Sequence, residues 1–217
     1  SMVAGFVAGY EKTKISFEKT LRNLQTDYLD LMLLHQPFSD YYGAWRALED
    51  LYDQGKLRSI GISNFYPDRM VDIASFARIC PMVNQVETHP FYQQTAAKKY
   101  MNKYGVQIEA WAPFGEGRGG LFENETLQEI GNQYGKTTAQ VMLRWNIQRG
   151  VVVIPKSTHY ERMKENIDVF DFALTESDME KISTLDKAES SFFSHYDPAI
   201  VEWFVKMVEE RKEKNRK

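Results

Sequence analysis

The sequence predicts an α/β fold in which βα units surround a parallel sheet. Apolar, strand-like runs alternate with amphipathic helices along the 217 residues, and polar residues follow the runs where each strand ends. With 43% hydrophobic and 26% charged residues, the chain can bury one sizeable core. No linker-like stretch divides it, so we expect a single domain over residues 1–217.

The first half of the chain shows three βα repeats after an opening helix. Apolar residues at near-helical spacing, such as Phe17 and Leu21, predict that helix over 11–24. Short apolar runs predict the strands, and Gly55 ends a helix at its C-terminus. The expected elements are strands over 29–35, 57–64 and 82–88, and helices over about 41–54, 67–77 and 93–104.

The second half continues the pattern. A Gly-rich loop over 115–120 separates a fourth strand from the next helix, and Thr137 or Thr138 is expected to cap the helix after that. Thr175 and Asp178 resemble a capping box before a short helix that ends near Leu185. The expected elements are strands over 106–111 and 151–155, helices over 124–134, 137–149 and 159–168, and a C-terminal loop and helix over 186–217, with the helix starting at Pro198.

Residues 151–166 give the clearest indication of a ligand. The apolar run Val151–Ile154 is typical of a strand buried on both faces, and a polar loop leads from it into a helix. Two cations, a hydroxyl and a helix N-terminus suit a phosphate, although an ordinary loop with solvated charges is the alternative. The residues concerned are Lys156, Ser157 and Arg162, with Ser157 or Thr158 as the expected helix cap.

Polar residues also gather at the ends of the other strands. In a parallel βα barrel the carboxyl ends of all strands meet on one face, where ligands bind. Five strands that end in this way indicate a shared site, whereas a single such residue more often caps a loop. The residues are His35, Ser63 with Asn64, Gln85 with Glu87, Trp111, and Lys156 with Ser157.

Composition excludes several function classes. A net charge of −3 and a pI near 5.9 argue against nucleic acid as the partner. No apolar run approaches the ~18 residues of a membrane span. The lone Cys80 excludes an internal disulfide and fits a reducing, cytoplasmic compartment. Residues 1–9 lack the basic start of a signal peptide, so we expect an irregular N-terminus, with Ser1-Met2 left by a cleaved tag.

Four motifs occur in order at these strand ends. They are Leu33-Leu34-His35-Gln36-Pro37; Gly61-Ile62-Ser63-Asn64-Phe65; Val83-Asn84-Gln85-Val86-Glu87 with His89-Pro90; and Ile154-Pro155-Lys156-Ser157 with Arg162 and Glu165-Asn166. From about Gly9 to the C-terminus the chain thus resembles the aldo-keto reductases. Trp111-Ala112-Pro113-Phe114 and the short loop after it are similar to the small prokaryotic-type diketogluconate and glyoxal reductases.

The resemblance implies a (β/α)8 TIM barrel that uses NADP(H) to interconvert aldehydes or ketones and alcohols by hydride transfer. It implies these roles: Ser63, Asn64 and Gln85 bind the nicotinamide carboxamide, Trp111 stacks on the nicotinamide ring, Lys156, Ser157 and Arg162 hold the 2′-phosphate, Glu165 and Asn166 contact the adenine, and His35 lies beside the substrate carbonyl. Phe91, Trp111, Phe193 and His195 are expected to line the substrate pocket.

Structural alternatives stay open for several of these residues. Trp111 is also consistent with barrel core, and His35 with a buried neutral histidine. Gln85 and Asn64 are also consistent with hydrogen bonds to loop backbone.

The resemblance further implies a catalytic aspartate, a tyrosine that acts as general acid, and a lysine that lowers the pKa of that tyrosine. The family places them in its first three βα units. Because the resemblance begins in the helix before the family's fourth strand, we expect a barrel truncated to about strands 4–8 with a C-terminal tail. A shortened gene product, the surviving part of a longer reductase, and strands supplied by a second chain all remain open.

The expected function is therefore NADP(H)-dependent oxidoreduction of a small carbonyl or alcohol, by a chain that is not competent alone. A non-catalytic NADP-binding or regulatory module is one alternative, and a structural remnant that binds nothing is another. The open edges of a five-stranded arc predict either self-association or poor stability.

Overall fold

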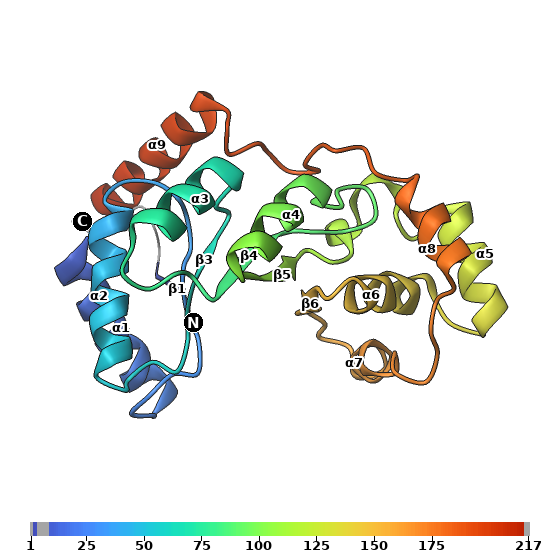
Figure 1. The fold of residues 1–217 in the computed structure, drawn as a ribbon, viewed down its shortest axis with the longest axis horizontal. Coiled ribbons are helices and arrows are strands. Elements are labelled where there is room, and N and C mark those ends of the chain that lie inside the picture. The colour runs from blue at the N-terminus through green and yellow to red at the C-terminus, as the bar shows by residue number, and fades with distance from the viewer. Residues whose placement is uncertain (1, 4–8, 215–217) are drawn as a thin grey trace. The chain divides into compact units, whose positions relative to one another are not determined.

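The computed structural model describes residues 2–3 and 9–214 of the chain (Figure 1). Helices follow strands along the chain, and every strand pairing given is parallel, as the sequence predicts. The strands are β1 (Met2–Val3), β2 (Met32–Leu34), β3 (Ile60–Ser63), β4 (Val83–Glu87), β5 (Gln107–Trp111) and β6 (Val152–Val153).

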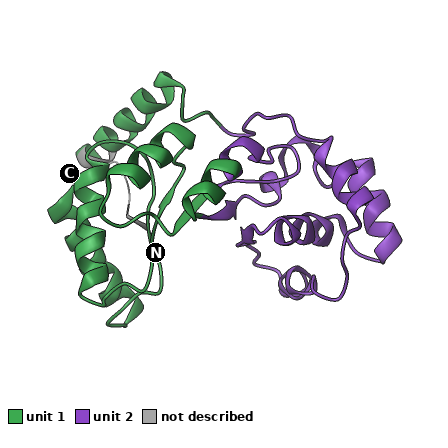
Figure 2. Cartoon of the chain, in the orientation of Figure 1, with its two compact units in different colours: residues 1–85, 99–106, 193–217 green, residues 86–98, 107–192 purple. Residues whose placement is uncertain are grey.

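The chain divides into two compact units, which Figure 2 shows in different colours. Unit 1 comprises residues 1–85, 99–106 and 193–217, and unit 2 comprises residues 86–98 and 107–192. Two of the boundaries fall inside β4 and inside a helix, and the others fall at the start of β5 and in the segment before Pro198.

Unit 1 contains a parallel sheet in which β1, β2, β3 and β4 pair in chain order. Gly61 is required in β3, because a Cβ there would lie 2.7 Å from the Val83 carbonyl oxygen and 2.6 Å from a Leu33 methyl carbon. β1 lies within the segment that was expected to be irregular. A two-residue strand is too short to produce a periodic pattern, and residues 1 and 4–8 lie outside the described part.

Apolar helix residues pack in unit 1 only in part as the spacing predicts, because Ile15 and Leu24 of the first helix are 66% and 59% exposed. Phe17, Leu48 and Ile62 are completely buried, which places the core between the first two helices and the sheet. The helices with residues in this unit are α1 (Tyr10–Leu24), α2 (Tyr41–Asp53), α3 (Pro67–Phe76), α4 (Thr95–Tyr104, which also has residues in unit 2) and α9 (Pro198–Lys214).

Unit 2 contains the parallel pair β5 and β6, and a core centred on Leu127, Met142 and Trp145. The Gly-rich loop forms a kinked 3-10 segment, η2 (Gly115–Gly120). The helices are α5 (Glu125–Tyr134), α6 (Thr138–Gln148), α7 (Tyr160–Ile167) and α8 (Glu176–Ser183).

The cap predicted at Thr137 or Thr138 and the capping box predicted at Thr175 are confirmed, and Thr137 also forms a capping box. The Thr137 hydroxyl accepts from the Gln140 amide, and the Gln140 side chain accepts in return from the Thr137 amide. Thr175 and Asp178 make the same reciprocal pair at the start of α8. These motifs are local, so the sequence alone identifies them.

Two predictions for residues 151–155 and the following helix are wrong. The strand spans only Val152–Val153, and Val152 and Ile154 are 44% and 48% exposed, so it is not buried on both faces. His159 is the N-cap of α7, without a side-chain hydrogen bond. The Ser157 hydroxyl instead accepts from the His159 amide at 3.1 Å, because a serine also closes a local turn of this kind.

Asp178 is expected to make the stability of the protein depend on acid pH. Burial alone raises the pKa of its carboxyl, but hydrogen bonds from the Tyr134 hydroxyl (2.5 Å) and from Thr175 outweigh this effect and hold the pKa below its ordinary 3.8. A lowered pKa contributes stability above the unfolded pKa and loses it as pH falls through the folded one.

We therefore expect Asp178→Asn to be less stable than the wild type above about pH 5, with the difference shrinking below pH 3.8. Urea unfolding measured from pH 2 to 7 tests this. Glu176→Gln, which removes an exposed carboxylate in the same helical turn, is the matched control. A difference that does not change with pH would contradict the prediction.

Candidate functional site

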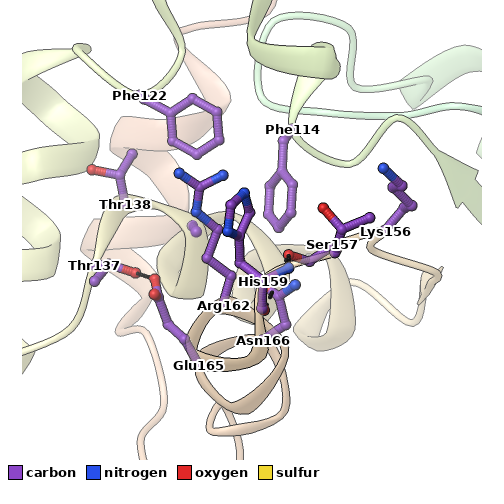
Figure 3. A pocket seen from close by; sticks show the side chains of 12 residues that line it. Phe114, Phe122, Thr137, Thr138, Lys156, Ser157, His159, Arg162, Glu165 and Asn166 are labelled. Atoms are coloured by element: carbon purple, nitrogen blue, oxygen red, sulfur yellow. Dashed lines mark hydrogen bonds between the residues drawn. The ribbon is translucent and has the colours of Figure 1, made fainter.

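A cavity of about 490 Å³ opens in unit 2 beside the loop that follows β6 (Figure 3). Three segments form it: the loop with α7, the N-terminus of α6, and two phenylalanines that flank η2 in the chain. Its lining residues are Phe114, Phe122, Thr137, Thr138, Ala139, Lys156, Ser157, Thr158, His159, Arg162, Glu165 and Asn166.

The charge of this cavity is predominantly positive. Lys156 and Arg162 contribute permanent cations, and Figure 3 shows the Arg162 guanidinium and the His159 ring extending to the same side of α7. Glu165 is the one carboxylate among the described lining residues, and the Thr137 hydroxyl donates a hydrogen bond to it. Such an excess of cations favours a multiply charged anion.

Helix geometry adds to this preference. Thr138 and Ala139, the first two residues of α6, line the cavity. Backbone N–H groups in the first turn of a helix have no partner within the helix and carry partial positive charge. The cavity thus combines cationic side chains, hydroxyls and a helix N-terminus, a set suited to a phosphate group.

Five residues singled out in the sequence come together here: Lys156, Ser157, Arg162, Glu165 and Asn166. All five line one cavity, and the site shared by all five strand ends that the sequence predicts stays a prediction. The individual roles that the resemblance implies for them stay predictions.

Other lining residues were missed. Thr137 and Thr138 were recognised only as helix caps, because nothing in the sequence places the start of α6 beside the loop after β6. Phe114 was recognised only as part of the motif that begins at Trp111, and Phe122, whose ring centroid lies 5.8 Å from that of Phe114, carried no signal. His159 lies inside residues 151–166, which the sequence singled out, and this position could have identified it as a lining residue.

Four further predicted residues gather in unit 1, at the ends of β2, β3 and β4. The Ser63 hydroxyl donates to the Gln85 carbonyl oxygen at 2.9 Å, and the Asn64 amide nitrogen donates to Ser63 Oγ at 3.2 Å and to the His35 carbonyl oxygen at 3.1 Å. These hydrogen bonds link the ends of β2 and β3 to β4, and the binding role of these residues stays a prediction. Asn64 has a left-handed backbone, with φ of 61°, which asparagine tolerates better than most residues.

His35 is partly buried, and burial lowers the pKa of its imidazole. Its ring is therefore neutral at pH 7. A neutral imidazole can donate one hydrogen bond and accept another, which suits a group that orients a carbonyl.

A second cavity, of about 440 Å³, lies in unit 1 and is lined in part by Asn64, Tyr66 and His195. His195 is hydrogen-bonded to Gln36 Oε1 at 2.7 Å, and its ring lies 5.1 Å from that of Phe193. His195 therefore lines a cavity, and its place in a substrate pocket stays a prediction, whereas Phe91 is 6% exposed and packs in the core of unit 2.

Trp111 ends β5 in unit 2 and is partly exposed, so it is not simply core. The edge of the Phe192 ring meets it, with centroids 5.0 Å apart and an interplanar angle of 61°. A contact of this kind restricts the orientation of a large flat ring, a property that suits a stacking platform.

The described residues contain no group of three or more His, Cys, Asp or Glu side chains arranged to hold a metal ion. Among the helices of the described part, none combines the length and the apolar composition needed to cross a membrane.

Comparison with known families gives a clear match. The sequence profile of the Aldo/keto reductase family matches residues 7–187. Glyoxal reductase from Bacillus subtilis (strain 168) is 50% identical over 182 residues, which cover 83% of this chain and 65% of that protein. The chain spans 64–65% of the length of three of the curated relatives that it matches.

Solved structures agree with this match. The aldo-keto reductase MGS-M4, from a deep-sea metagenome library of the Medee basin, superposes with a TM-score of 0.86 at 41% identity, covering 89% of this chain and 72% of that one. An aldo-keto reductase of the silkworm Bombyx mori, solved in complex with NADP, gives a TM-score of 0.82 at 30% identity over 87% and 67% of the two chains.

Proposed function

The chain belongs to the aldo/keto reductase family, and from this premise we propose that it binds NADP(H) and serves the interconversion of small carbonyl compounds and alcohols. The observation that carries the proposal is the cationic cavity of unit 2, where Lys156, Ser157 and Arg162 lie beside a helix N-terminus. Two relatives of known structure were solved with NADPH and with NADP, which supports the choice of ligand.

The residues present fit the adenosine end of this cofactor. Arg162 and Lys156 offer the charge that a 2′-phosphate needs, and an arginine fork binds phosphate oxygens in pairs. Asn166 and Glu165 offer groups for the adenine edge, with Glu165 held in place by Thr137. A cavity of about 490 Å³ is large enough for a nucleoside phosphate.

The strand-end residues would serve the reactive end. When bound, the nicotinamide supplies a hydride to a carbonyl carbon or removes one from an alcohol. Asn64 and Gln85 would bind its carboxamide, and Trp111 would fix which face of the ring is presented. His35, as a neutral imidazole, would hydrogen-bond the carbonyl oxygen and orient it.

The expectation that this chain does not reduce carbonyls alone belongs to the same proposal. It follows from the catalytic residues that the resemblance implies and that the motifs in this sequence do not supply. Hydride addition leaves negative charge on oxygen, which needs a proton donor or strong electrostatic support.

A titration with NADPH tests the proposal. We expect bound NADPH to change its own fluorescence and to quench that of tryptophan, and the Trp111→Phe variant to lose most of that quenching. Absence of binding to the folded protein would overturn the proposal.

Turnover of NADPH with glyoxal, chosen because a relative is named for it, separates the remaining outcomes. Binding without turnover supports a non-catalytic NADP-binding module that does not supply the general acid. Turnover proportional to protein concentration supports an enzyme and contradicts the expected lack of competence.

Self-association and a cytoplasmic location stay predictions. Exposed apolar side chains on α7, including Tyr160 and Ile167 at 72% each, support self-association. Sedimentation velocity that shows a single monomer at all concentrations would contradict it.

A further inference from the structure

A buried carboxylate outside the proposed cofactor contacts lies at the end of β4. Glu87 is 4% exposed, and both of its oxygens are engaged. Oε1 accepts a hydrogen bond from the Ser191 amide at 2.8 Å and lies 2.9 Å from His89 Nε2, and Oε2 accepts from the Ser190 hydroxyl. A buried carboxylate costs free energy unless its oxygens are satisfied in this way, so these contacts form as a set.

His89 serves this carboxylate. Its ring is completely buried, and within the described part of the chain Nδ1 has no hydrogen-bond partner. The tautomer that carries its proton on Nε2 donates to Glu87 and leaves no buried donor unpaired. His89 thus holds the Glu87 carboxylate in place from a completely buried position.

The segment held by Glu87 leads directly to the ring that contacts Trp111. Ser190 Oγ accepts from the Phe192 amide at 3.0 Å, which ties the turn together. The Arg118 side chain donates to the Ser191 carbonyl oxygen, and its guanidinium carbon lies 4.2 Å from the centroid of the Phe192 ring. Phe192 then meets Trp111 edge to face.

We propose that Glu87 is a positioning residue for Trp111, acting through Ser190, Ser191 and Phe192. This inference rests on the proposed function, because Trp111 is the ring that is proposed there to stack on the nicotinamide. Its physical basis is independent of any ligand: a turn tied by hydrogen bonds to a buried charge has few conformations, so the ring it carries restricts its neighbour.

Fluorine NMR of protein labelled with 5-fluorotryptophan tests this without cofactor. The chain has four tryptophans, and single Trp→Phe variants assign their signals. Glu87→Gln keeps the shape but replaces one acceptor oxygen by a nitrogen that cannot accept from Ser190 or Ser191. We expect the Trp111 signal to shift or broaden while those of Trp45, Trp145 and Trp203 stay in place.

Glu49→Gln is the matched control in unit 1. Glu49 is also 4% exposed and accepts from the Ile79 amide at 2.7 Å, and Trp45 donates to the Ile79 carbonyl oxygen at 3.1 Å. This variant should move the Trp45 signal and leave that of Trp111 unchanged. A Trp111 signal that stays unchanged in folded Glu87→Gln, or that moves no more than the other three, overturns the proposal.

If Glu87→Gln does not fold, the milder variant Ser190→Ala tests the proposal. Ser190→Ala removes the hydroxyl between Glu87 and the Phe192 amide and should move the Trp111 signal. Ser194→Ala breaks an equivalent turn, from Ser194 Oγ to the Tyr196 amide at 3.2 Å, and should not move it. Equal effects of the two serine variants on the Trp111 signal would also overturn the proposal.

Titration of the same variants with NADPH separates this inference from the proposed function. We expect Glu87→Gln to bind NADPH about 2- to 10-fold more weakly, the range that the loss of one aromatic contact gives. If the wild type does not bind NADPH, the proposed function fails, while the Trp111 signal still decides whether Glu87 positions that ring.

Discussion

Replacing Arg162 by alanine is expected to weaken NADPH binding about 10- to 100-fold and to leave NADH binding nearly unchanged. A hydrogen-bonded pair between a guanidinium and a phosphate contributes about 1.5–3 kcal/mol, and each 1.4 kcal/mol is about tenfold in affinity. Only NADPH carries the 2′-phosphate that Arg162 would bind, so the loss should be confined to it. Fluorescence titration with each nucleotide measures the two dissociation constants, and hence how far each variant changes the ratio of NADPH affinity to NADH affinity.

Lys164→Ala is the matched control for this prediction. Lys164 lies on the same helix, α7, is exposed and does not line the cavity, so its loss removes one positive charge but no residue of the cavity wall. We expect less than a twofold change in NADPH affinity. Equal weakening of NADPH and NADH by Arg162→Ala would contradict the assigned role, as would equal effects of the two variants.

Replacing Trp145 by alanine is expected to lower the free energy of unfolding by about 3–5 kcal/mol, the range for a large aromatic side chain removed from a core. Trp145 is 1% exposed at the centre of the unit 2 core, and the Arg149 guanidinium carbon lies 4.1 Å from its ring centroid. The surrounding residues come from several elements and cannot collapse together into the space. Since whole domains are stable by about 5–15 kcal/mol, this single change approaches the limit for folding.

Urea unfolding followed by circular dichroism measures this loss. Trp203→Ala is the control, because Trp203 on α9 is 53% exposed and its removal leaves no cavity. We expect it to cost less than about 1 kcal/mol. If the two variants lost similar stability, the core assigned to unit 2 would be wrong.

The order of helices and strands followed from the sequence because its signals are local. Apolar spacing predicted α2 and α3 to within a residue at each end, a threonine cap predicted the start of α6, and a capping box predicted the start of α8. Strands were less well predicted. β2 spans Met32–Leu34 within the predicted 29–35, because strand ends depend on where the neighbouring strand stops pairing.

The candidate site was predicted only in part for the same reason. Lys156, Ser157 and Arg162 lie within one short segment, so their grouping could be recognised from the sequence. Thr138 and Phe122 come from segments far away in the chain, and only packing brings them to the same cavity.

By itself, the sequence determined the fold class, the family and the residues at the strand ends, since periodicity, turn residues and motifs are properties of neighbouring residues. The tertiary structure alone decided which of these residues share a cavity, that Ser157 closes a turn rather than capping α7, and that Glu87 holds the segment before Phe192. These outcomes depend on contacts between residues up to 104 positions apart, which no local pattern records.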